Sequence, residues 1–256
     1  MIGRALLTFG LACQRATHQR RDFETMEVGD TEPARAVHNW RIEAREYARH
    51  EDRRGRRFAY TTLVPATTAL VVIDMVPFHV ADNAYCRGVV PNINRLAETL
   101  RAAGGTVAWV LPGASEPGPA AIEFFGRRIA ETYSDTGGAG ASHTRLWSEL
   151  ITDPGDLFLE KFAFSAFFPG RCTLPQQLQQ RNIDTVLITG TVTNVCCESS
   201  ARDAATLGFR VIMVADGNAA RRDQDHNATL HTIYRSFGDV RPTSDVLAMI
   251  RHAEGR

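Results

Sequence analysis

Three residues of the sequence, Asp74, Lys161 and Cys196, have side chains that together could perform nucleophilic catalysis. Asp74 and Lys161 each close a predicted strand, and Cys196 lies in the first turn of a predicted helix. Backbone N–H groups in a first helical turn favour a thiolate, and so does a nearby ammonium. A carboxylate can accept the thiol proton and return it to a leaving amine. Because sites in open α/β sheets lie at the carboxyl ends of strands, we expect the three residues to converge.

Each candidate also has a purely structural interpretation. Asp74 would be ordinary in a turn after a strand, and an isolated lysine such as Lys161 is usually a surface residue. Cys197 lies about 100° further round the predicted helix than Cys196, which favours a packing role. His79 follows Asp74 closely, but an isolated histidine is usually neither a base nor a ligand. Two further cysteines are expected to be structural, Cys86 and Cys172.

Hydrophobic patterning predicts alternating strands and helices from residue 66 onward. Short continuous apolar runs are typical of strands buried on both faces. The predicted strands are 68–74, 106–111, 156–161, 184–189, 210–216 and a short one near Val240. The predicted helices are 88–105, 119–133, 172–182, 194–208, 224–238 and 243–253. This alternation predicts an α/β fold, a single-domain three-layer α/β/α sandwich with a mostly parallel, doubly wound sheet of about six strands.

Composition excludes several classes of function. The 29 basic and 29 acidic residues cancel, so no global charge attracts nucleic acid or an anionic membrane. No apolar run approaches the roughly 18–20 residues that cross a bilayer. The five cysteines are scattered and form no C-x-x-C pair, which argues against a disulfide framework or a zinc site. We therefore expect a cytoplasmic protein.

The N-terminal quarter lacks this periodicity. Residues 1–40 are expected to be a disordered tail, and the chain could also start at Met26. Residues 1–13 loosely resemble a leader, but their apolar part spans only about eight residues. Residues 41–65 are expected to form an arm that packs on the core, with a solvated basic run at 53–57. The predicted folded domain covers 66–256.

Three segments resemble the isochorismatase-like cysteine hydrolases over about residues 66–250. They are ALVVIDM at 69–75, EKFAFSAFF at 160–168 and TGTVTNVCCESSARDA at 189–204. The resemblance implies a catalytic triad of Asp74, Lys161 and Cys196, with Cys196 as the nucleophile. It also implies a cis Thr191–Val192 peptide bond and an oxyanion hole made by the backbone N–H groups of Val192 and Cys196. The implied reaction cleaves an amide through a thioester.

The sequence departs from the family pattern at two places. Family members commonly have Gln-Asn after the Asp-Met, and here Val-Pro-Phe-His follows at 76–79, which makes the pocket wall more apolar. Phe78, His79 and Phe167 are the predicted substrate contacts. Metal-binding members carry a histidine motif after the second strand, and PGASEPGPA at 112–120 has none. We therefore predict no metal and no cofactor.

The segment around Cys196 resembles the branch that contains ureido and carbamoyl amidohydrolases and streptothricin hydrolase. The predicted substrate is the lactam of streptothricin, which hydrolysis would inactivate as an antibiotic. The alternatives are a ureidoacrylate or N-carbamoyl amidohydrolase, and a non-catalytic binding module on the same fold. A nucleotide-binding oxidoreductase is disfavoured because DMVPFHV, without a glycine-rich loop, follows the first strand. By analogy with the family, a homodimer or homotetramer is expected.

Overall fold

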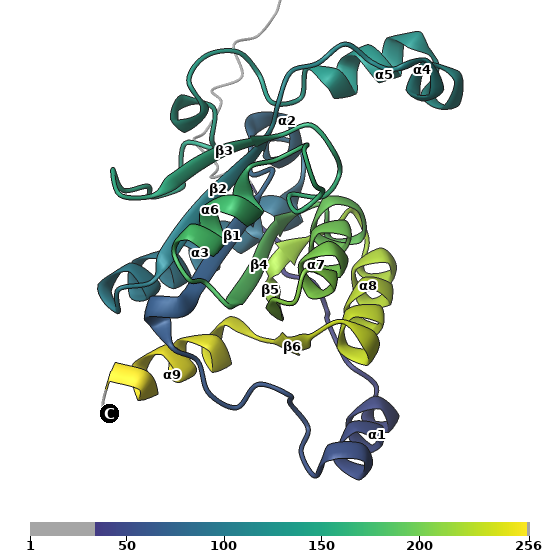
Figure 1. Ribbon diagram of the computed structural model, residues 1–256. Helices are drawn as coiled ribbons and strands as arrows, with labels where there is room; N and C mark the ends of the chain where they lie inside the picture. The colour runs from purple at the N-terminus through teal and green to yellow at the C-terminus, as the bar shows by residue number, and fades with distance from the viewer. Residues whose placement is uncertain (1–33, 255–256) are drawn as a thin grey trace, which may run out of the picture. The chain divides into compact units, whose positions relative to one another are not determined.

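The computed structural model, which describes residues 34–254, is built around a six-stranded parallel sheet (Figure 1). The spatial order of its strands is β3-β2-β1-β4-β5-β6. The strands are β1 (Thr68–Ile73), β2 (Thr106–Pro112), β3 (Leu157–Lys161), β4 (Thr185–Thr191), β5 (Arg210–Ala219) and β6 (Asp239–Arg241). All five strand pairs are parallel. The predicted α/β class and doubly wound parallel sheet are confirmed.

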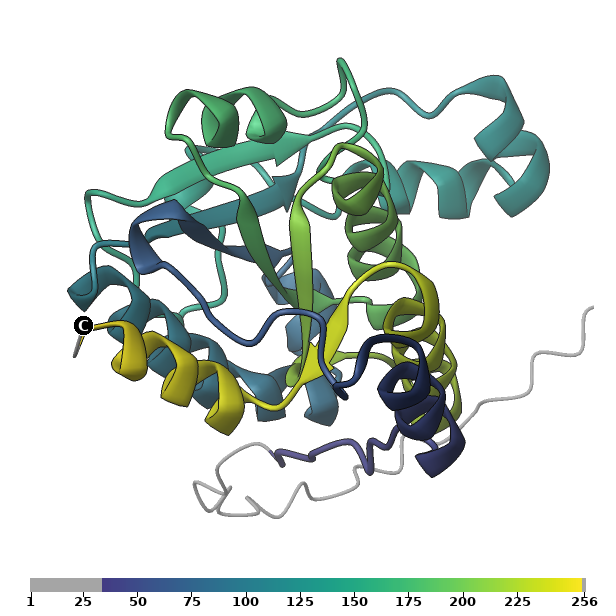
Figure 2. The ribbon, with the colours of Figure 1, turned by 60° about the horizontal axis from the view of Figure 1, so that its bottom comes forward.

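Helices cover both faces of the sheet, as Figures 1 and 2 show. The longer helices are α1 (Ala44–Arg54), α3 (Ala84–Ala102), α8 (Asp223–Ser236) and α9 (Thr243–Glu254). The shorter ones are α2 (Pro77–Val80), α4 (Pro119–Phe125), α5 (Arg127–Ser134), α6 (Leu174–Gln180) and α7 (Glu198–Thr206). Short 3₁₀ turns span Pro65–Thr67 and Ser142–Thr144, and a π-helical turn spans Thr193–Cys197.

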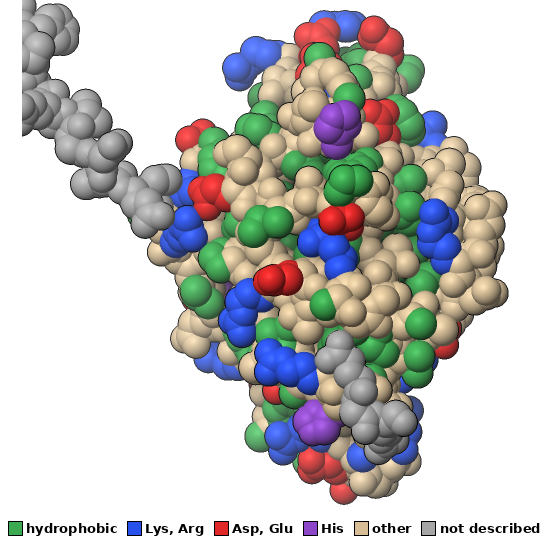
Figure 3. All heavy atoms as spheres, turned by 90° about the vertical axis from the view of Figure 1, so that its left-hand side faces the viewer, with side chains coloured by type: hydrophobic (Ala, Val, Ile, Leu, Met, Phe, Trp, Pro, Cys, Tyr) green, Lys and Arg blue, Asp and Glu red, His purple; other side chains and the backbone are tan. Residues whose placement is uncertain are grey.

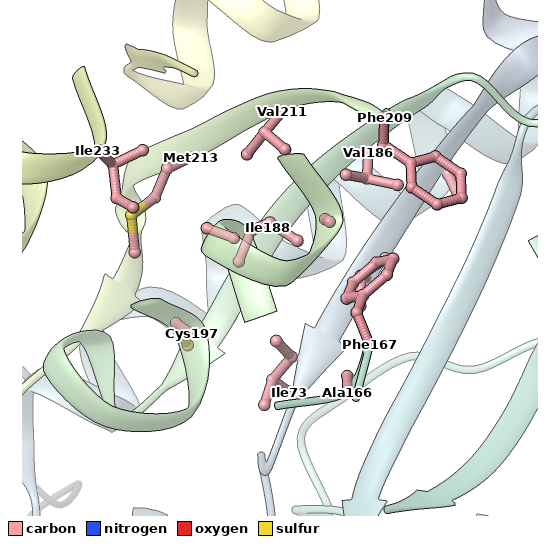
Figure 4. Close-up of a cluster of buried hydrophobic side chains, with 14 of the residues drawn as sticks. Ile73, Ala166, Phe167, Val186, Ile188, Cys197, Phe209, Val211, Met213 and Ile233 are labelled. Carbon is pink, nitrogen blue, oxygen red and sulfur yellow. The ribbon is translucent and has the colours of Figure 1, made fainter. Parts of the chain in front are cut away.

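Two apolar clusters, one on each face, hold the layers together. The cluster beneath α3 and α9 contains Leu70, Trp109 and Ile250. The cluster beneath α6, α7 and α8 contains Phe167, Ile188 and others (Figure 4). Because β1 is buried on both faces, its successive side chains enter the two clusters in turn, which explains its continuous apolar sequence.

The strand order reverses between β1 and β4, and this reversal places the candidate site. In doubly wound sheets a crevice opens beyond the carboxyl ends of the strands at such a point. The two strands approach closely there, because a Cβ on Gly190 would lie only 2.1 Å from the carbonyl oxygen of Ile73. Gly190 also has a φ of 111°, a value that favours glycine. The residue after β1 is thereby held against the end of β4.

Several predicted boundaries differ from the structure. The helix expected over 119–133 is interrupted at Gly126, whose φ of 78° ends α4 before α5 begins. Strand β5 continues to Ala219, and its irregular pairing with β4 is bridged by Asn218, whose amide donates to the carbonyls of Ile188 and Val214. The helix expected over 194–208 begins with a π-helical turn rather than an α-helical one. π-helical turns are frequent at functional sites.

The N-terminal segment is described from residue 34 onward. Most of the predicted tail, residues 1–33, lies outside the described residues. Within the expected arm, α1 packs beside α8 through edge-to-face contact of Tyr47 with Tyr234.

Figure 3 shows acidic and basic side chains interspersed on one face of the molecule. Among residues 34–254, no helix is both long enough and apolar enough to cross a membrane.

We predict that Gly190→Ala destabilises the fold by about 3 kcal/mol, because the new Cβ collides with the backbone of Ile73 and φ is unfavourable. Gly104→Ala is the matched control. Gly104 also has a positive φ, of 81°, but open space surrounds it, so strain alone should cost about 1 kcal/mol. Urea denaturation measures both, and equal losses of unfolding free energy would contradict the close-approach argument.

Candidate active site

A buried ion pair joins two of the predicted residues. Lys161, the last residue of β3, donates from Nζ to Oδ2 of Asp74 over 2.9 Å. Their side chains are only 4% and 2% exposed, so water screens the pair very little. Asp74 follows β1 with a φ of 53°, unusual for a residue other than glycine. Its backbone N–H still donates to the carbonyl of Val110 in β2, which fixes this sharp exit from the strand.

The same ammonium also contacts the cysteine. Nζ of Lys161 lies 3.4 Å from Sγ of Cys196 and 3.1 Å from the carbonyl oxygen of Ala163. A lysine ammonium has three donors, and these three contacts account for all of them. The sequence prediction that Asp74, Lys161 and Cys196 converge at one edge of the sheet therefore agrees with the geometry.

The turn that carries Cys196 is fixed from several sides. The predicted cis Thr191–Val192 peptide bond is present, and the carbonyl of Val192 accepts from the N–H groups of Val195 and Cys197. Ser200, at the start of α7, accepts through Oγ from the N–H of Ala166, in the loop after Lys161. The turn and this loop are thus tied together.

The two adjacent cysteines have different surroundings. Cys196 is partly exposed, whereas Cys197 is fully buried in the apolar cluster near Ile73 and Ile188 (Figure 4). Burial raises the pKa of Cys197 well above its ordinary value, and the neighbouring Cys196 raises it further. The predicted packing role of Cys197 agrees with this placement.

Electrostatics keep Cys196 protonated at rest. Burial raises the pKa of the Cys196 thiol, the Asp74 carboxylate raises it again, and Lys161 only partly opposes them. Burial by itself would lower the pKa of Lys161, but Asp74 and Cys196 raise it above its ordinary value. The resting site is therefore an ammonium, a carboxylate and a neutral thiol, and not the thiolate that the helix position suggested. Oδ1 of Asp74 is buried and has no hydrogen-bond partner among the described residues, so it is free to accept a proton.

The comparisons with known proteins agree with this geometry. The model of the isochorismatase domain matches residues 68–245. This chain belongs to the isochorismatase family. A ureidoacrylate amidohydrolase, RutB of Rhizobium rhizogenes, is 27% identical over 215 residues, which cover 75% of this chain and 87% of RutB. The chain is thus an isochorismatase-family hydrolase.

Solved structures share the fold. A cysteine hydrolase from Pseudomonas syringae pv. phaseolicola superposes with a TM-score of 0.67 at 24% identity, covering 77% of this chain and 98% of that one. N-carbamoylsarcosine amidase from Thermoplasma acidophilum superposes with a TM-score of 0.57 at 27% identity, covering 69% and 96%. The isochorismatase-like fold is thereby confirmed.

The predicted substrate contacts fall into two groups in this family member. Phe78 is 46% exposed, and its ring meets that of the partly buried His79 edge to face in α2, the helix after Asp74. Burial lowers the pKa of His79, Asp74 opposes this shift, and Lys161 and Arg221 lower the pKa further. Phe167, in contrast, is fully buried against Phe209 in the core (Figure 4), so its prediction as a substrate contact disagrees with its placement.

Arg221 was missed by the sequence analysis. It follows β5 at the same edge of the sheet, is exposed, and acts electrostatically on both His79 and Cys86. Among the described residues it has no ion-pair or hydrogen-bond partner, whereas the adjacent Arg222 is paired with Asp225. The sequence signal was available, since a strand extended to Ala219 would have placed an arginine at its carboxyl end.

Metal-ligating residues do not gather at this site. Within residues 34–254, no group of three or more His, Cys, Asp or Glu side chains has the arrangement of a metal centre. The chemistry that the described side chains supply directly is nucleophilic and acid–base chemistry.

We predict that alkylation of Cys196 by iodoacetamide keeps accelerating from pH 7 to pH 10. Because the pKa of this thiol is raised, the thiolate fraction should grow about tenfold per pH unit over the whole range. The rate is measured by peptide mass spectrometry, with Cys196→Ala as the blank. A plateau reached by pH 7 would show instead a preformed thiolate.

Proposed function

We propose that this hydrolase is a cysteine amidohydrolase that cleaves the C–N bond of a ureido acid, an N-carbamoyl compound that carries a carboxylate. The observation that carries the proposal is the single ammonium of Lys161, which touches both Oδ2 of Asp74 and Sγ of Cys196. That arrangement joins a nucleophile to a base within one buried network. A binding module would not need a carboxylate with a buried, unpartnered oxygen beside a thiol.

The first half of the proposed reaction makes an acyl-enzyme. Sγ of Cys196 attacks the carbamoyl carbon, and its proton passes to the free Oδ1 of Asp74. The tetrahedral intermediate then collapses, the C–N bond breaks, and Asp74 gives the proton to the leaving amine. Burial by itself would lower the pKa of Lys161, but Asp74 and Cys196 raise it, so Lys161 stays charged throughout. Its ammonium stabilises the carboxylate at rest and the thiolate during attack.

The second half restores the enzyme. Water attacks the carbonyl carbon of the S-carbamoyl cysteine, and Asp74 accepts one proton from it. The C–S bond breaks, carbamic acid leaves, and Asp74 returns the proton to Sγ of Cys196. Backbone N–H groups of Val192 and Cys196 are the proposed donors to the oxyanion in both halves, since Val192 precedes the turn that presents the sulfur and Cys196 lies within it.

Two observations favour a ureido acid over other amides. The similar proteins named as a ureidoacrylate amidohydrolase and an N-carbamoylsarcosine amidase act, by their names, on carbamoyl compounds that carry a carboxylate. The unpartnered guanidinium of Arg221 is suited to that carboxylate, because arginine binds carboxylates in a bidentate geometry. The predicted streptothricin lactam has no comparable support in the comparisons and stays a prediction.

The predicted homodimer or homotetramer also stays a proposal. Helices α4 and α5 expose the aromatic side chains of Phe124, Phe125 and Tyr133. Clustered exposed aromatic side chains are typical of surfaces that another protein covers. A homo-oligomer would bury them.

The direct test is a turnover panel of ureidoacrylate, N-carbamoylsarcosine, N-carbamoylglycinamide, streptothricin and nicotinamide. The amine product is measured by mass spectrometry. We expect the wild type to release amine from the two ureido acids and Cys196→Ala to release none. Hydrolysis of streptothricin alone would replace the substrate class while keeping the mechanism. Unchanged turnover in Cys196→Ala would overturn the mechanism.

Arg221→Ala separates the carboxylate anchor from the chemistry. We expect KM for a ureido acid to rise about fivefold or more, as for loss of an exposed ion pair, with little change in kcat. Arg222→Ala is the matched control, since the adjacent guanidinium is already paired with Asp225. Equal KM values in the two variants would contradict the role of Arg221. A neutral ureide such as N-carbamoylglycinamide should not discriminate between them.

A further inference from the structure

We propose that the N-terminal strap, residues 34–41, positions the active site through His38, which holds the loop of Arg221 and the turn of Cys196 in place. The strap precedes the residues that match the isochorismatase domain, 68–245. His38 touches none of the reacting atoms, so it is a positioning residue. The inference rests on the proposed roles of Cys196 and Arg221.

His38 is wedged between two aromatic side chains of the domain. Its ring stacks on Tyr85 with centroids 3.9 Å apart and on His226 with centroids 4.2 Å apart, nearly parallel in both cases. It is only 5% exposed. Tyr85 begins α3 and His226 lies in the first turns of α8, so one side chain bridges elements on opposite faces of the sheet.

Both ring nitrogens of His38 form hydrogen bonds. The backbone N–H of Ala220 can only donate, so Nε2 of His38 accepts from it over 3.0 Å. The ring proton then lies on Nδ1, which donates to Oδ1 of Asp223 over 2.7 Å. Ala220 and Asp223 are close neighbours of Arg221 on either side in the chain, so His38 fixes the loop that carries the unpartnered guanidinium.

A second set of contacts connects His38 to the turn that carries Cys196. His226 stacks on His38 and pairs through Nδ1 with Oγ1 of Thr193 over 2.9 Å. Thr193 is fully buried and is the first residue of the π-helical turn that contains Cys196. Burial lowers the pKa of His226 to about 3, and His38 lowers it as well, so the ring stays neutral in this contact.

The domain has residues that receive the strap. The N–H of Ala36 donates to the carbonyl of Ala84, and a Cβ on Gly88 would lie 1.8 Å from the carbonyl oxygen of Ala36. Asn227 pairs with the strap twice, accepting from the N–H of Arg41 and donating to the carbonyl of Asn39. Such a close fit along eight residues indicates a fixed part of the site and not a passing contact.

The test compares alkylation of Cys196 by iodoacetate and by iodoacetamide, relative to a free thiol. The reagents differ by a carboxylate that Arg221 can bind, so their rate ratio reports on this loop without any substrate. The iodoacetamide rate alone reports on the position of the thiol beside Asp74. We expect His38→Ala to lower the ratio about fivefold, as Arg221→Ala does, and to slow iodoacetamide as well. His38→Gln should restore part of the rate ratio and part of the iodoacetamide rate, since the amide oxygen of glutamine can accept from the N–H of Ala220.

His50→Ala is the matched control. His50 is also buried, also precedes the family domain, and donates to the carbonyl of Tyr234 near the other end of α8. The His50→Ala variant should melt at a lower temperature than wild type, while its rate ratio and its iodoacetamide rate stay at wild-type values. Wild-type values in folded His38→Ala, or equal losses in His50→Ala, would overturn the positioning role.

The two proposals fail in distinguishable ways. If Arg221→Ala leaves the ratio unchanged, the anchor in the proposed function is wrong, and the iodoacetamide rate alone then decides on the strap. If His38→Ala does not fold, His38→Phe, which keeps a ring between Tyr85 and His226 but loses both hydrogen bonds, provides both readouts. A folded His38→Phe with wild-type ratio and rate, compared with a strong defect in Asn227→Ala, would assign the role to the strap backbone and not to the hydrogen bonds of His38.

Discussion

The contact on which the site depends is the buried ion pair between Lys161 and Asp74. Two charges removed from water are costly unless they are paired, and here the ammonium has three acceptors, one of them Oδ2 of Asp74 and another the sulfur of Cys196. The pair links the ends of β1 and β3 to the turn after β4. It also sets the chemistry, because burial and then the carboxylate that the lysine holds in place raise the pKa of the thiol, and this carboxylate can accept its proton.

The fold supplies the geometry that this pair requires. A parallel sheet brings every strand end to one edge, and the reversal of strand order between β1 and β4 opens that edge for a substrate. Gly190 lets the two central strands come close enough for Asp74 to face the cysteine turn. Around this centre, buried contacts join the loop after Lys161 to α7 and the loop after β5 to the N-terminal strap. The strap is joined in turn, through the ring of His226, to Thr193 in the turn of Cys196.

Much of this arrangement could be predicted from the sequence, for a physical reason. Buried parallel strands need continuous apolar runs, so their ends are visible, and polar residues at those ends stand out as Asp74 and Lys161 did. Other features depend on contacts that no local pattern reports. His38 lies in a segment without periodicity, Arg221 follows a strand lengthened by an irregular pairing, and Phe167 turns inward although its neighbours Phe164 and Phe168 are exposed. The protonation state of Cys196 also followed from burial and from Asp74, which outweigh the position of the thiol in its helical turn.

The most direct test of the account is the mass of the enzyme during turnover. Wild type and Cys197→Ala would be mixed with a ureido acid that turns over, quenched in acid within milliseconds, and analysed by intact-protein and peptide mass spectrometry. The account predicts a transient gain of one carbamoyl group on the peptide of residue 196 in both proteins, because Cys197 only packs. Steady turnover with Cys196 unmodified at every time point, or a carbamoyl group on another residue, would contradict it.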